Sequence, residues 1–93
     1  MNFTGLYNYY ERLVLDYISS ELVSRYPEHD EDFFLDVACY SLTRLPARYI
    51  RHEIDLIYYQ EPGELEQIKD RVVGVVDDAA EFINQREKEK KRS

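Results

Sequence analysis

Three prolines divide this chain into four segments, and this feature constrains the fold most, because three of the segments have room for one helix each. They are Pro27, Pro46 and Pro62, and the last is followed directly by Gly63. Proline lacks an amide hydrogen, and it disfavours helical geometry in the residue before it. The sequence therefore predicts one helix before Pro27, a second before Pro46 and a third after Gly63.

Apolar residues recur every three or four positions in all three segments, which is the period of an amphipathic helix. We expect helices over residues of about 5–25, 31–45 and 64–85, with Asp30 as the N-cap of the second. The apolar seam of the third helix is Leu65, Ile68, Val72, Val75, Ala79 and Phe82. We expect this helix to pack on the first, within a single domain of residues 1–85, and residues 86–93 to form a charged, frayed tail.

The segment 49–59 alternates between two faces and is rich in Ile and Tyr, which is typical of a β-strand. A helical interpretation through Ile50, Ile54 and Ile57 also fits. As a strand it has no evident partner in the chain, and pairing with the same strand of a second copy would satisfy its backbone. The expected fold is mainly α, with three amphipathic helices, one short extended or β segment and a two-fold homodimer.

Charge is distributed so that one basic window lies within an acidic chain. The net charge is −7, yet residues 37–52 contain three arginines and no acid. An acidic protein repels nucleic acids and anionic membranes, whereas local guanidinium groups can bind a small phosphate-bearing ligand. The same arginines also fit a simpler interpretation as solvated residues near a helix end.

The sequence contains none of the familiar motifs for catalysis or metal binding. The one cysteine, Cys39, excludes an intrachain disulfide and a Cys-rich zinc site, and it fits a reducing compartment. There is no phosphate-binding loop, nucleophile elbow, HExxH or CxxC. Neither a secretory signal nor an apolar run of about 20 residues is present. We expect a cytoplasmic protein that is not an enzyme and holds no metal or cofactor.

Residues 41–50, SLTRLPARYI, and the Asp36-Val37 pair before them resemble the late-competence ComFB family. The pattern of that family is an Asp-Val pair, a helix and an N-x-L-P-P-x-Y-V-like turn. Thr43 and Ala47 stand where the family often has Asn and a second Pro. Some members also carry a Cys cluster that holds zinc, and this chain lacks it.

The resemblance implies a small, mainly helical, cytosolic homodimer that acts as a receptor for cyclic dinucleotides. The expected ligand is cyclic di-GMP first and cyclic di-AMP second, and an unknown downstream protein would receive the signal. Such a ligand offers two phosphates to arginine forks and two flat bases for stacking. The residues expected to bind it are Arg44, Arg48, Tyr49, Arg51, His52 and Asp36. Two roles remain open for each of two residues: Asp36 can accept hydrogen bonds from a guanine edge or hold an arginine, and Tyr49 can be a stacking platform or belong to the core. The alternative function is a ligand-independent dimeric adaptor for other proteins.

Overall fold

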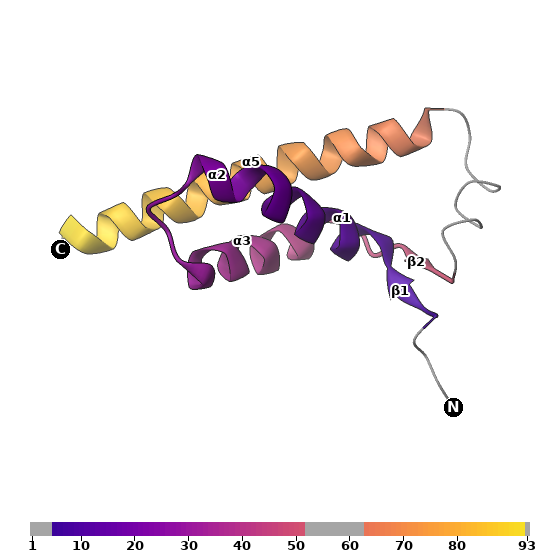
Figure 1. Cartoon of the computed structure of the whole chain (residues 1–93), viewed down its shortest axis with the longest axis horizontal. Coiled ribbons are helices and arrows are strands. Elements are labelled where there is room, and N and C mark those ends of the chain that lie inside the picture. The colour runs from indigo at the N-terminus through magenta and orange to yellow at the C-terminus, as the bar shows by residue number, and fades with distance from the viewer. Residues whose placement is uncertain (1–4, 52–62, 93) are drawn as a thin grey trace.

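The structure, a computed structural model, describes residues 5–51 and 63–92 and is mainly helical (Figure 1). In chain order its elements are β1 (Tyr7–Asn8), α1 (Tyr9–Tyr17), η1 (Ile18–Leu22), α2 (Val23–Arg25), α3 (Glu31–Thr43), β2 (Tyr49–Ile50) and α5 (Glu64–Arg92). Because α1, η1 and α2 follow one another without a break, they form one helix with a π-helical turn inside it. The predicted mainly α fold with three helices is confirmed.

Polar side chains cap the first and second helices. Asn8 accepts a hydrogen bond from the backbone N–H of Tyr10 at 3.2 Å, so the first helix begins later than predicted. Asp30 accepts from the backbone N–H of Phe33 at 3.2 Å, which confirms it as the cap of α3. The first-turn acids of α3 lie at the positive end of the helix dipole and add to this start signal.

The π-helical turn η1 keeps one face of the first helix against the core. The buried residues of this helix that follow Tyr10 are spaced by four: Val14, Ile18 and Leu22. Since 3.6 residues complete an α-helical turn, a four-residue spacing drifts by about 40° at each step. In η1 the N–H of Val23 donates to the carbonyl of Ile18, five residues earlier, and this wider turn offsets the drift.

β1 and β2 form an antiparallel pair in which Tyr7 lies opposite Ile50 and Asn8 opposite Tyr49. This pairing corrects the expectation that the extended segment has no partner in its own chain, and it removes that argument for a dimer. The partner was missed because residues 7–8 were predicted as helix. Residues 52–59 of the predicted extended segment lie outside the described residues.

Asn8 also joins the two strands to the helix that follows them. Besides capping α1, its side-chain oxygen accepts the backbone N–H of Arg48 at 3.0 Å. The next residue, Tyr9, donates its backbone N–H to the carbonyl of Arg48 at 2.7 Å. Asn8 thus caps the start of α1 and also binds the segment after α3 to that start.

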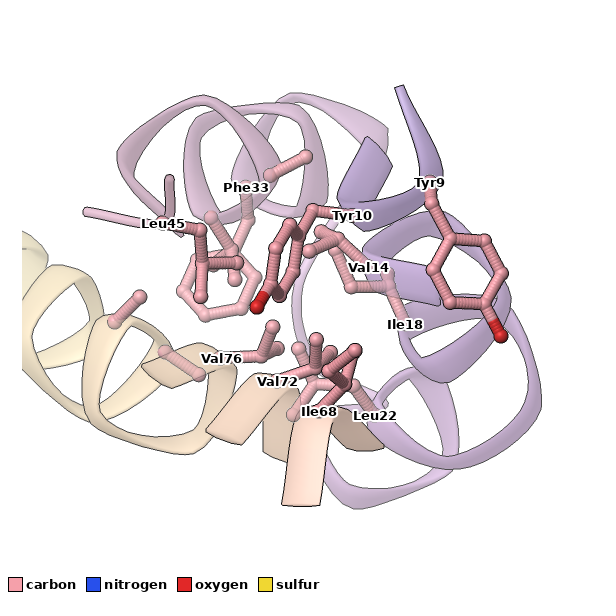
Figure 2. Packing of buried hydrophobic residues seen from close by; sticks show 14 of the residues in the cluster. Tyr9, Tyr10, Val14, Ile18, Leu22, Phe33, Leu45, Ile68, Val72 and Val76 are labelled. Atoms are coloured by element: carbon pink, nitrogen blue, oxygen red, sulfur yellow. The ribbon is translucent and has the colours of Figure 1, made fainter. Parts of the chain in front are cut away.

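The hydrophobic core lies where the first helix, α3 and α5 meet (Figure 2). Its largest fully buried apolar side chains are Phe33, Leu22, Val14, Val37 and Val76. On α5 the buried residues include Ala79 and Ala80, whose small side chains allow close approach of the neighbouring helices. The prediction that the third helix packs on the first is confirmed, and α5 also packs on α3.

α5 continues to Arg92, past the predicted end of the third helix. The added segment is rich in Glu, Lys and Arg, which are good helix formers. Near the predicted end of the helix, α5 also contacts the turn before α3: the His29 ring nitrogens lie 2.8 Å from Asn84 Oδ1 and 3.2 Å from Glu87 Oε2. Within the described residues, neither α5 nor any other helix is long and apolar enough to cross a bilayer.

A polar cluster joins the first helix to the middle of α5. The Tyr17 hydroxyl donates to Asp77 Oδ1 at 2.8 Å, and the Arg25 guanidinium contacts both groups. Partial burial, followed by the hydrogen bond to Asp77, raises the pKa of Tyr17 above its ordinary value of 10.0. The folded state therefore favours the protonated phenol more than the unfolded chain does.

This pKa shift predicts a loss of stability at alkaline pH. Because the pKa of Tyr17 is raised on folding, its protonated hydroxyl stabilises the folded state fully below a pH of about 10. This stabilisation is lost as the pH rises through the folded-state pKa. We expect the free energy of unfolding, measured by urea denaturation, to fall less steeply with rising pH in Tyr17→Phe than in wild type, between about pH 8 and about pH 11. Parallel curves for both proteins would contradict this role.

Candidate functional site

The predicted ligand-binding residues do not gather at one place in the structure. Asp36 lines a groove between α3 and α5, and Arg44 is the C-cap residue of α3. Tyr49 lines a different groove, beside α1. Arg51 is exposed just after β2, and His52 lies outside the described residues.

Arg48 is engaged in contacts that stabilise the fold. Its Nη1 donates to Glu64 Oε1 at 2.9 Å, and the two side chains are each about one-third exposed. Both line a small pocket of about 150 Å³ together with Tyr10 and Arg71. Its backbone is bonded to Asn8 and Tyr9, as described above. Arg48 therefore ties the segment after α3 to both the first helix and the start of α5.

The groove between α3 and α5, with a volume of about 370 Å³, brings aromatic and charged side chains together. Its lining residues are Asp36, Cys39, Tyr40, Thr43, Phe82, Ile83, Arg86, Glu87 and Lys90. The two helices lie side by side and run in opposite directions (Figure 1). Residues four apart share a helix face. The spacing therefore aligns Asp36, Tyr40 and Arg44 on α3, and Phe82, Arg86 and Lys90 on α5.

Four of these side chains form a continuous series of ring and guanidinium contacts, which we call the stacked row. Tyr40 and Phe82 stack with ring centres 5.0 Å apart and planes inclined by 22°. Arg44 Cζ lies 5.4 Å from the Tyr40 ring centre, and its Nη1 donates to the Tyr40 hydroxyl at 3.1 Å. Arg86 Cζ lies 5.7 Å from the Phe82 ring centre. The order of contacts is thus Arg44, Tyr40, Phe82, Arg86.

The two arginines of the stacked row have no carboxylate partner among the described residues. In residues 5–51 and 63–92, no carboxylate lies within ion-pair distance of Arg44 or Arg86, whereas Arg25 and Arg48 are each paired with one. The acids and bases that line the groove balance each other, and Arg44 beside them adds one positive charge. The groove therefore presents the Arg86 guanidinium beside an aromatic surface, and Arg44 lies next to the groove against Tyr40. Phe82 in that surface is 42% exposed.

The groove that Tyr49 lines has a different character. Its volume is about 530 Å³, and it lies between the strand pair and α1. Three exposed apolar side chains border it, namely Leu6, Leu15 and Tyr49, the last of which is 66% exposed. Its charged residues are two acids, Glu11 and Asp16, and one base, Arg12. This apolar, slightly negative surface suits contact with another protein better than binding of a doubly charged anion.

The α5 half of the stacked row was missed by sequence reasoning. Phe82 fits the spacing of the apolar seam, so it was expected in the core, and Arg86 was assigned to the tail. A usable signal does exist in the sequence, because an aromatic residue is followed four positions later by arginine on both helices: Tyr40 with Arg44 and Phe82 with Arg86. That spacing favours a cation–π contact on one helix face.

The comparisons with known proteins agree with the motif noted at residues 36–50. No curated protein and no solved structure matches the chain. The family described as late competence development protein ComFB matches residues 7–87. This match spans most of the chain and includes Asp36 and the whole stacked row. The chain therefore belongs to the late competence development protein ComFB family.

Proposed function

We propose that this protein is a non-catalytic receptor for a cyclic dinucleotide second messenger, with cyclic di-GMP preferred to cyclic di-AMP. The ligand would bind in the groove between α3 and α5, and the receptor would pass the signal to a partner protein. The observation that carries this proposal is the stacked row, in which two guanidinium groups without carboxylate partners in the described chain flank two stacked rings.

The chemistry of the ligand matches that of the groove. Each of its two phosphates can accept paired hydrogen bonds from a guanidinium fork, here Arg44 and Arg86. Its bases can stack on an exposed ring, which contributes about 1–3 kcal/mol per base in nucleic-acid complexes. Phe82 supplies such a surface because its ring is partly exposed, and the Tyr40 ring stacks on it. A compact ligand also avoids the long-range repulsion that a chain of net charge −7 exerts on anionic polymers.

We further propose that the protein works in the cytoplasm as a homodimer. The exposed apolar border of the second groove, formed by Leu6, Leu15 and Tyr49, supports contact with another protein chain. The same surface is what favours the alternative function, a ligand-independent dimeric adaptor. The two functions differ in what the α3–α5 groove does, since only a receptor needs its arginines.

Calorimetric titration of the purified chain with cyclic di-GMP, cyclic di-AMP and linear pGpG tests the receptor function. We expect micromolar or tighter binding of cyclic di-GMP, weaker binding of cyclic di-AMP, and little heat with the linear dinucleotide. Light scattering on the same samples would give the mass of the particle and thus test the dimer. Absence of heat with both cyclic dinucleotides would overturn the receptor function and leave the adaptor.

A further inference from the structure

We infer that Asp36 is the residue that selects guanine over adenine in the α3–α5 groove. This inference rests on the proposed function and adds to it a base-specific role for one carboxylate. Asp36 lies one helical turn before Tyr40 on α3, so its side chain borders the aromatic surface on which a base would stack.

The Asp36 carboxylate has no hydrogen bond or ion pair to any other side chain in residues 5–51 and 63–92. Arg86 lines the same groove but does not lie within ion-pair distance of it. Asp36 is exposed and is therefore not needed to balance a buried charge. Its hydrogen-bonding capacity remains available for a ligand.

The negative charge of Asp36 restricts which ligands the groove can bind. A carboxylate beside the arginines of a phosphate-binding groove repels a doubly negative ligand, so it weakens binding unless the ligand donates hydrogen bonds to it. A guanine base can do so, because its N1–H and N2–H₂ groups lie side by side and match the two oxygens of one carboxylate. Adenine presents N6–H₂ beside the N1 lone pair, which a carboxylate repels.

An asparagine at this position reverses the preference. Its amide offers one acceptor and one donor, which complement the N6–H₂ and N1 groups of adenine. It also removes a negative charge from the groove, which favours any ligand that carries two phosphates. Asp36→Asn should therefore weaken cyclic di-GMP binding and strengthen cyclic di-AMP binding. A purely electrostatic role for Asp36 predicts that both ligands bind more tightly.

The test is calorimetric titration of wild type, Asp36→Asn and Asp70→Asn with both cyclic dinucleotides. Asp70 is an exposed acid on α5 that does not line the groove, so its variant makes the same change in net charge elsewhere. We expect Asp36→Asn to lose about tenfold or more in affinity for cyclic di-GMP and to gain for cyclic di-AMP, with Asp70→Asn like wild type.

The outcomes separate this inference from the proposed function. If wild type binds and Asp36→Asn shifts both ligands in the same direction, the base-specific role is wrong while the receptor stands. If wild type binds and neither ligand shifts, the same conclusion follows. If wild type binds neither ligand, the receptor function fails and the role of Asp36 fails with it.

Discussion

Replacement of Phe33 by alanine is expected to lower the free energy of unfolding by about 3–5 kcal/mol. The Phe33 ring is 1% exposed at the junction of the three helices. One face of it stacks on the His29 imidazole, with ring centres 3.7 Å apart. Since His29 in turn contacts Asn84 and Glu87, the cavity would also loosen the link between the start of α3 and the far half of α5.

The loss is large for a domain of this size, whose total stability is about 5–14 kcal/mol. Urea denaturation followed by circular dichroism should show it, and Tm should fall by about 12 °C or more. Ser41→Ala is the matched control, because Ser41 is equally buried on α3 while its hydroxyl has no hydrogen-bond partner in the described residues. Deleting that hydroxyl should be neutral or stabilising. Equal losses in both variants would contradict the central position of Phe33.

Reversal of the charge of Arg86 is expected to weaken cyclic di-GMP binding by about 100-fold, or about 2.7 kcal/mol. Arg86→Glu removes one guanidinium fork and places a carboxylate next to the phosphates instead. It also removes the cation–π contact with Phe82, so the exposed ring loses its neighbour on that side. Arg86 is exposed and has no carboxylate partner in the described residues, so we expect the variant to stay folded.

Lys88→Glu is the control for this variant. Lys88 is exposed on the same helix but does not line the groove, and its reversal changes the net charge of the chain by the same amount. Titration of both should show that only Arg86→Glu loses affinity; similar losses would point to the overall charge instead of the groove. Arg48→Glu is less suitable, because it would set a second carboxylate against Glu64, 2.9 Å from the present guanidinium nitrogen. A fold defect would then mimic a binding defect.

The candidate site was predictable from the sequence only in part. Of the residues proposed from the motif, Asp36 lines the α3–α5 groove and Arg44 contacts Tyr40, which also lines it. Arg48 and Tyr49, although close to them in sequence, point to other parts of the molecule because Pro46 ends the helix before them. Phe82 and Arg86 come from about 40 residues away and join the site only because α5 packs antiparallel on α3.

Local rules were sufficient for the helices. Proline positions and apolar spacing located all three, and Asp30 was identified as a cap, since these signals act within a few residues of the chain. Only the tertiary structure decided that β2 pairs with β1, that α5 continues to Arg92 and that Phe82 meets Tyr40. Each of these depends on contacts between residues far apart in the chain. These contacts stabilise the protein only when the whole core assembles, so they cannot be predicted from a short stretch of the sequence.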